Sequence, residues 1–122
     1  MTATKIKVAL ADDHILLRHA LATLINKSDR FMVTLEASNG KDLIDQLTGP
    51  VQPEIIILDL NMPEMDGQET AQWLMNNHPH IRVVMLTMYD SELVLIRLLK
   101  AGVKGFMKKD IHPTELMFAL QS

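Results

Sequence analysis

The chain has 122 residues, 48% of them hydrophobic and 22% charged, which is enough for one domain with a buried core and too few for two. The net charge of −3 provides no basic surface for nucleic acid, and the lack of cysteine excludes disulfides and thiolate metal sites. The sequence holds neither a signal-peptide pattern nor an apolar run of membrane length, so we expect a cytoplasmic single domain that does not enter a membrane.

Five short apolar runs predict the strands of a sheet. Each run is brief and rich in Val, Ile, Leu or Met, as is typical of central parallel strands that are buried on both faces. The runs cover residues 5–11, 31–36, 54–59, 81–86 and 103–107.

Longer segments with helical periodicity follow each of these runs. They cover about residues 14–26, 39–49, 67–77, 90–102 and 113–122. Asn39 predicts an N-cap, Gly102 predicts a C′ position and Pro113 predicts a first-turn position. In the first segment we expect Arg18 opposite the apolar face, and we expect His14 to cap the helix or pack against it.

The alternation of strand and helix predicts the fold class. Five repeats imply a doubly wound α/β domain, with a five-stranded parallel sheet and five helices. Ligand sites of such sheets lie at the carboxyl ends of the strands. Asp12, Asp13, Asp59 and Thr87 all fall there. Any one of them alone would be an ordinary cap or turn residue, but the four together indicate a site.

The chemistry of this set points to phosphoryl transfer. Three crowded carboxylates demand a counter-cation or a raised pKa, and an all-oxygen ligand set suits Mg²⁺ or Mn²⁺ better than zinc. Asp59 would be the nucleophile and would form an acyl phosphate. Thr87 and Lys109, at the ends of neighbouring strands, can supply a hydroxyl donor and a fixed cation for the phosphoryl oxygens.

The same residues carry a resemblance to a known family. Asp12-Asp13, the segment Asp59-Leu-Asn-Met-Pro-Glu-Met-Asp-Gly67, Thr87 and the segment Gly105-Phe-Met-Lys-Lys-Asp110 resemble the receiver domain of bacterial two-component response regulators over essentially the whole chain. The segment Ala11-Asp-Asp-His-Ile-Leu-Leu-Arg18 is similar to the NarL/FixJ (LuxR-type) subfamily in particular.

The resemblance implies a flavodoxin-like receiver fold over residues 1–122 and a role in phosphorelay signalling. The phosphoryl group would come from a sensor histidine kinase or a phosphotransfer protein, in a reaction that depends on Mg²⁺ or Mn²⁺. Such a domain is not an enzyme in the usual sense, although it catalyses its own phosphorylation and dephosphorylation.

The resemblance also implies roles for single residues around the metal. Asp59 would be the phosphoacceptor. Asp13, Asp59 and the backbone carbonyl of Asn61 would bind Mg²⁺ directly, and Asp12 would act through water. Asn61 and Tyr89 match the positions that tune dephosphorylation.

A second group of residues would contact the phosphoryl group and transmit the change. Thr87 and Lys109 would contact the phosphoryl oxygens, and Phe106 matches the aromatic residue that moves with the threonine. A frame error of one residue would transfer the role of Lys109 to Lys108. Many receivers have a cis Lys-Pro bond where this chain has Lys109-Asp110, so the isomer here stays open.

The output surface is predicted on the fourth helical segment and its neighbours. Periodicity predicts a wide apolar face of Val94, Leu95, Leu98 and Leu99, with Arg97 and Lys100 opposite, and leaves open whether that face is buried or contacts a partner. Leu93 and Ile96 flank the charges, so we expect some apolar surface to stay exposed. The resemblance favours a partner or homodimer face of the fourth helix, fifth strand and fifth helix, consisting of Leu93, Leu95, Ile96, Leu99 and Phe106.

DNA contact is expected only through a domain that this chain lacks. Regulators of the subfamily usually carry a C-terminal helix-turn-helix domain that controls transcription. The sequence ends at Ser122, within or just after the fifth helix. Truncation and a stand-alone receiver both remain open.

Three alternatives are weighed against this interpretation. A metal-dependent aspartyl-phosphate phosphatase or phosphotransferase commonly has a second acid two residues after the nucleophile, where this chain has Asn61. A binder of nucleotide or flavin is disfavoured because the acid pair Asp12-Asp13 has the wrong charge for phosphate. A transition-metal site at His78 and His80 is disfavoured because these residues fit the end of a helix and the connection after it.

Overall fold

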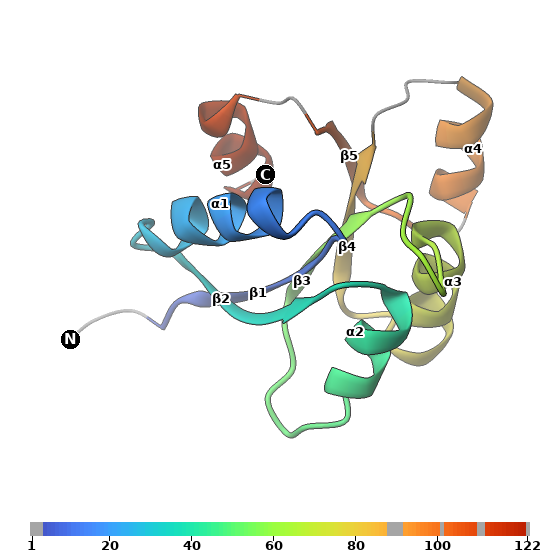
Figure 1. The fold of residues 1–122 in the computed structure, drawn as a ribbon, viewed down its shortest axis with the longest axis horizontal. Helices are drawn as coiled ribbons and strands as arrows, with labels where there is room; N and C mark the ends of the chain where they lie inside the picture. The colour runs from blue at the N-terminus through green and yellow to red at the C-terminus, as the bar shows by residue number, and fades with distance from the viewer. Residues whose placement is uncertain (1–3, 88–91, 101, 110–111, 122) are drawn as a thin grey trace.

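Five parallel strands form one sheet in the computed structural model, which describes residues 4–87, 92–100, 102–109 and 112–121. The strands are β1 (Ile6–Ala11), β2 (Phe31–Ala37), β3 (Ile55–Asp59), β4 (Arg82–Thr87) and β5 (Gly105–Lys108). Their order in the sheet is β2-β1-β3-β4-β5 (Figure 1). The strand order reverses between β1 and β3, which confirms the doubly wound fold predicted from the sequence.

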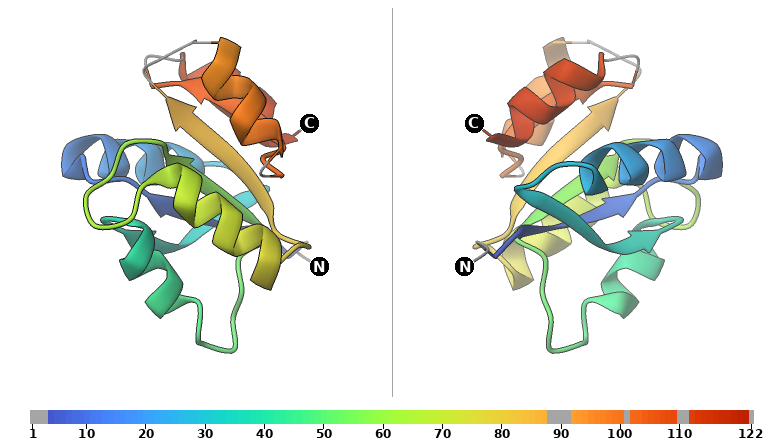
Figure 2. Two further views of the ribbon diagram at one scale, coloured as in Figure 1. Left: turned by 90° about the vertical axis from the view of Figure 1, so that its right-hand side faces the viewer. Right: turned by 90° about the vertical axis from the view of Figure 1, so that its left-hand side faces the viewer.

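Five helices cover the two faces of the sheet. They are α1 (Ile15–Asn26), α2 (Gly40–Gln46), α3 (Gly67–Asn77), α4 (Glu92–Lys100) and α5 (Pro113–Gln121). Both views in Figure 2 show α1 and α2 on opposite sides of the sheet. Apolar residues of α1 and α5 pack on one face, and apolar residues of α2, α3 and α4 pack on the other. In the described part of the chain, each helix is too short or too polar to cross a membrane.

The central strand β3 separates two apolar clusters. Ile55 and Ile57 face the α1/α5 side, whereas Ile56 and Leu58 face the side of α2, α3 and α4. All of them are at most 4% exposed. This alternation is the period of two expected for a strand, and burial on both faces explains the unbroken apolar run.

Helix boundaries follow local capping chemistry. Asn39 caps α2 as predicted, because its side chain accepts a hydrogen bond from the amide of Asp42 at 2.8 Å. The helix α2 ends at Gln46, earlier than the predicted residue 49. There the Gln52 side chain donates to the carbonyls of Leu47 and Gly49, which replaces the next helical hydrogen bonds.

The connection before β5 also differs from the prediction. The strand begins at Gly105, not at Val103. Gly102 has a φ of 92°, a conformation that favours glycine, and the next amide, of Val103, donates to the carbonyl of Leu98 at 3.1 Å. Val103 therefore closes the end of α4 and packs in the core before the strand starts.

Candidate functional site

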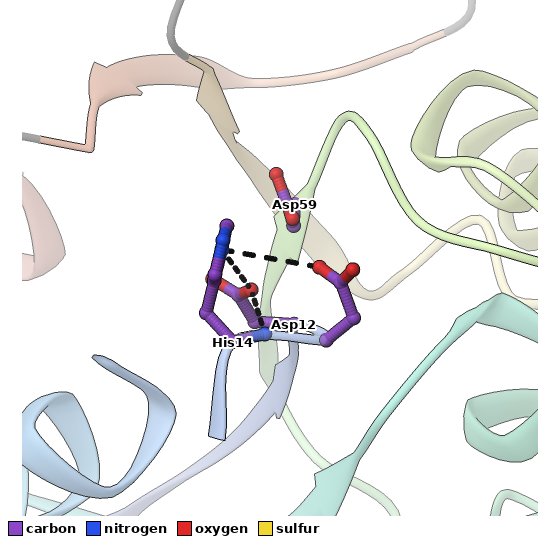
Figure 3. A group of neighbouring side chains, drawn as sticks. Asp12, His14 and Asp59 are labelled. Carbon is purple, nitrogen blue, oxygen red and sulfur yellow. Dashed lines mark hydrogen bonds and ion pairs between the residues drawn. The ribbon is translucent and has the colours of Figure 1, made fainter. Parts of the chain in front are cut away.

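Neighbouring strands bring acidic residues together at one end of the sheet. Asp12 and Asp13 follow β1, and Asp59 is the last residue of β3, the strand that pairs directly with β1. Potential ligand atoms of Asp12, Asp13, His14 and Asp59 all lie within 4.8 Å of one another. Figure 3 shows Asp12 and His14 on the loop after β1, with Asp59 facing them from the end of β3.

Asp12 is held in place by backbone contacts and has one carboxylate oxygen left over. It is 2% exposed, and its amide donates to the carbonyl of Ala37 at 3.0 Å. Its Oδ1 accepts from the amide of His14 at 2.8 Å, but Oδ2 is buried with no hydrogen-bond partner among the described residues. A buried unsatisfied carboxylate oxygen is costly, so this position favours a cation.

Asp59 is the most deeply buried acid of the pocket, at 1% exposure. Its Oδ2 accepts from Lys109 Nζ at 2.9 Å, and its Oδ1 accepts from the amide of Asn61 at 3.3 Å. Burial raises the pKa of Asp59 to about 6; the Lys109 hydrogen bond opposes this shift and the nearby charge of Asp12 adds to it. At neutral pH the group is mostly ionised, at an energetic cost that a divalent cation would offset.

Lys109 is the cation that the chain itself places in this pocket. Its side chain is only 8% exposed, and Nζ lies 2.9 Å from His14 Nδ1 and 3.5 Å from Asp12 Oδ1, besides its contact with Asp59. Lys108, which the sequence left as the alternative, is an exposed residue at the end of β5. The structure therefore brings Lys109, and not Lys108, to the acidic residues.

The loop after Asp59 turns back sharply to begin α3. The amide of Gly67 donates to the carbonyl of Leu60 at 2.8 Å, and a Cβ at Gly67 would collide with the backbone of Asp59 and Leu60. Asp66 caps the helix by accepting from the amide of Glu69 at 2.9 Å. Close approach of backbone to backbone thus requires glycine at this position and fixes the wall beside Asp59.

The remaining predicted site residues are distributed around this centre. Thr87 is 2% exposed at the last position of β4, beside β3, and Asn61 is exposed on the loop after Asp59. Phe106 is half-buried and packs against the cluster on the α2, α3 and α4 side. Tyr89 and the bond from Lys109 to Asp110 lie outside the described residues.

Two residues near the pocket have contacts that the sequence does not predict. Arg18, expected on the outer face of α1, is instead largely buried, with a side chain 12% exposed. Its guanidinium donates to the carbonyl of Asp12 at 2.8 Å, to the carbonyl of Ala37 at 3.2 Å and to Glu36 at 3.1 Å. It therefore ties the loop that carries the acid pair to the end of β2.

His14 meets the expectation only in its position. It occupies the N-cap position of α1 but makes no side-chain cap hydrogen bond. Its ring instead joins the acidic residues, with Nδ1 at 3.4 Å from Asp12 Oδ1 and 3.9 Å from Asp13 Oδ1. The only sequence signal for this was its position directly after the acid pair.

The apolar side chains of α4 are divided between the core and the solvent. Leu98 is fully buried and Leu95 partly so, but Leu99, assigned to the same apolar face, is 57% exposed. Leu93 and Ile96 are exposed, as expected from their position beside the charged residues. The helix contacts the sheet along a narrow stripe, so residues at its margins stay in solvent.

Comparison with known proteins agrees with this geometry. The chain matches the family model of the response regulator receiver domain over residues 8–121. The chain belongs to this family. As a receiver domain it is similar to the transcriptional regulatory protein YxjL of Bacillus subtilis, with 36% identity over all of this chain and 56% of that protein. It is also similar to the nitrate/nitrite response regulator NarL of Escherichia coli, with 37% identity over 93% of this chain and 52% of that protein.

Solved structures give the same result. The signal receiver domain of the Mycobacterium tuberculosis protein named NarL matches with a TM-score of 0.90 and 28% identity, over 98% of this chain and 95% of that one. The receiver domain of a CheY-like protein from Methanospirillum hungatei, at 17% identity and a TM-score of 0.86, shares the fold. This receiver domain spans about half the length of the curated relatives that it matches.

The residues of the pocket fit the cation that receiver domains generally bind. Three carboxylates converge, one of their buried oxygens has no partner among the described residues, and carboxylate oxygens are the preferred ligands of Mg²⁺. The donor set therefore fits a hard divalent ion at the mouth of β1 and β3.

Proposed function

We propose that this receiver domain accepts a phosphoryl group on Asp59 from a sensor histidine kinase or phosphotransfer protein, in a reaction that depends on a divalent cation. One observation carries the proposal. Asp59 is a buried carboxylate that contacts Lys109 Nζ at 2.9 Å and lies beside Asp12, whose Oδ2 has no partner in the described part of the chain. A buried acid flanked by a fixed cation and by metal ligands is what nucleophilic attack on a phosphoryl group requires.

The transfer itself needs little covalent chemistry from the protein. A carboxylate oxygen of Asp59 forms a bond to phosphorus while the bond from phosphorus to the donor histidine nitrogen breaks, and that nitrogen keeps the electron pair. Lys109, already fixed by its contact with Asp59, neutralises charge on the phosphoryl oxygens. Thr87 would donate a hydrogen bond to one of these oxygens.

The divalent cation would be held by the two acidic loops. In this proposal Asp13, Asp59 and the carbonyl of Asn61 bind it directly, and Asp12 acts through water. Bound there, Mg²⁺ would supply positive charge that lets an anionic donor enter an acidic pocket. The solvent-facing side chain of Asp13, 38% exposed, leaves this side of the pocket accessible to such a donor.

The output would be a change in the face formed by α4, β5 and α5. A shift from about 1% to 99% of the active state needs about 5.5 kcal/mol, whereas one charge-assisted hydrogen bond contributes roughly 1.5–3 kcal/mol. Thr87, Lys109 and the cation would therefore act together, with Phe106 following Thr87. The exposed side chains of Leu93, Ile96 and Leu99 would then form the contact with a homodimer partner.

The rest of the pathway is proposed from the relatives. Both similar proteins from B. subtilis and E. coli are named as regulators, and this chain covers about half of each. We infer that phosphorylation controls a helix-turn-helix output domain and thereby transcription. Turnover as a phosphatase is not favoured, because Asn61 lies where such an enzyme would hold its second acid.

Intact-mass measurement with acetyl phosphate as donor tests the proposal. We expect a phosphorylated species with Mg²⁺ and none after addition of EDTA or in the Asp59→Asn variant. Lys109→Ala should lose labelling while its matched control, Lys108→Ala, keeps it. Full labelling of the Asp59→Asn variant, or labelling that EDTA leaves unchanged, would contradict the assignment.

A further inference from the structure

The imidazole of His14 is the one nitrogen donor among the potential metal ligands of the acidic pocket in the described part of the chain. One ring nitrogen of His14 and one carboxylate oxygen each of Asp12, Asp13 and Asp59 all lie within 4.8 Å of one another. Figure 3 shows His14 beside Asp12 and Asp59. The role of the pocket as a carboxylate site for Mg²⁺ gives His14 no function. An imidazole in that position changes the chemistry of the ligand set.

The contact with Lys109 indicates which way the His14 lone pair points. Lys109 Nζ lies 2.9 Å from Nδ1, and a lysine ammonium can only donate hydrogen bonds. Nδ1 therefore accepts, and its lone pair faces the same cation that contacts Asp59 Oδ2 at 2.9 Å and approaches Asp12 Oδ1 at 3.5 Å. His14 Nδ1 and these two carboxylates already share one positive charge.

The backbone holds His14 in this arrangement. Its amide donates to Asp12 Oδ1 at 2.8 Å, which fixes the start of the side chain relative to the acid pair, and it precedes the first residue of α1. The side chain is 66% exposed, so the ring can adjust to an ion without disturbing the core. The position is thus fixed at the backbone and adaptable at the ring.

We propose that His14 Nδ1 exchanges its hydrogen bond from Lys109 for coordination of the divalent cation, so that this pocket prefers the 3d ions Mn²⁺, Co²⁺ and Zn²⁺ over Mg²⁺. The inference rests on the proposed function of the same pocket and deepens it. Imidazole binds 3d metals well, whereas Mg²⁺ prefers oxygen ligands. One nitrogen added to the carboxylates therefore shifts the preference of the site.

Pulsed electron paramagnetic resonance of Mn²⁺ bound to the full chain tests the ligand directly. We expect ¹⁴N modulation from a coordinated imidazole in the wild-type protein and its loss in His14→Ala. His19→Ala is the matched control, because His19 lies on α1, the helix that His14 precedes, is 63% exposed and does not belong to the group of potential metal ligands. Its spectrum should equal that of the wild type.

Metal competition measured by titration calorimetry gives a second readout. His14→Ala should lower the ratio of Mn²⁺ affinity to Mg²⁺ affinity by about tenfold or more, on the scale of changes around metal ligands. His14→Asn, which offers an oxygen, should abolish the ¹⁴N signal and retain Mg²⁺ binding. Because the side chain is 66% exposed, we expect both variants to fold, and circular dichroism checks this.

The two proposals fail in different ways. Labelling of Asp59 with Mg²⁺, combined with no ¹⁴N modulation in wild type or an unchanged affinity ratio in His14→Ala, overturns the role of His14 alone. If neither the wild type nor the His14 variants are phosphorylated on Asp59 with Mg²⁺ or Mn²⁺, the proposed function is overturned as well. Modulation that persists in His14→Ala assigns the nitrogen to another residue and also overturns the inference.

Discussion

Strand β3 contains two regions that are equally buried and do opposite things. Leu58 and Asp59 are adjacent and at most 1% exposed. Leu58 packs in the apolar core, where burial stabilises the fold. Asp59 places a carboxylate in a site that opposes its ionisation. The comparison teaches that the strand stabilises the fold along its length and places the reactive group at its last residue. Burial of Leu58 raises the free energy of unfolding, whereas burial of the Asp59 carboxylate lowers it.

The largest expected effect is the loss of core packing in β3. Ile57→Ala should lower the free energy of unfolding by about 2–5 kcal/mol, because Ile57 is 1% exposed and a cavity would remain. Urea denaturation followed by circular dichroism measures this change. A loss below 1 kcal/mol would show that the strand is not the rigid support of the site.

Asp59→Asn should instead raise the free energy of unfolding of the metal-free protein. The pKa of Asp59 rises from 3.8 when unfolded to about 6 when folded, so the folded state binds the proton more tightly. Stability therefore falls as pH rises through this window, and above pH 6 the full cost, roughly 1–3 kcal/mol, remains.

The amide variant should remove this cost at pH 7 and flatten the stability profile between pH 4 and 6. Thermal unfolding across that range, with EDTA present, provides the measurement. Mg²⁺ should then stabilise the wild type and have little effect on the variant. A variant less stable than the wild type at pH 7 would contradict burial as the main cause of the raised pKa.

A smaller effect is expected where the pocket is tied to β2. Arg18→Met removes donors to the carbonyls of Asp12 and Ala37. It should lower the free energy of unfolding by about 1–3 kcal/mol and weaken Mg²⁺ binding. Arg97→Met, on the exposed side of α4, is the control and should change neither quantity. Equal Mg²⁺ affinity in both variants would show that Arg18 does not position the acid pair.

The smallest expected effect is on the exposed side of α4. Leu99→Ser should change stability by no more than about 0.5 kcal/mol, because the side chain is 57% exposed. Leu98→Ala, one residue earlier and fully buried, should cost about 2–5 kcal/mol. Denaturation of the two variants in parallel tests whether α4 contacts the sheet along a narrow stripe. Similar losses of stability in both variants would contradict this.

The sequence predicts the sheet and the meeting of its acidic residues because both depend on simple rules. Apolar runs determine buried strands, and parallel strands end at one edge, so the proximity of Asp12, Asp13 and Asp59 follows from their positions alone. The side-chain cap at Asn39 follows from local hydrogen bonding in the same way.

The errors concern features that depend on tertiary contacts. The helical period predicts an outward Arg18 because it does not show that β2 ends beside this residue, where the carbonyl of Ala37 can accept a further hydrogen bond. For Leu99 the helical period leaves burial and partner contact both open, because it gives the direction of a face and not the width of its contact. The convergence of His14 on the acids depends on the turn after β1, which the amide of His14 closes by bonding to Asp12. That turn has no separate sequence signal.

Peptide mass mapping after reaction with acetyl phosphate and Mg²⁺ tests the central claim most directly. The pocket holds several groups that could attack phosphorus, including the Asp12 and Asp13 carboxylates and His14 Nδ1. The buried position of Asp59 against Lys109 predicts that the phosphoryl group is found on the peptide containing Asp59, and on no peptide when EDTA is present. Modification of the peptide containing Asp12, Asp13 and His14 instead would contradict it.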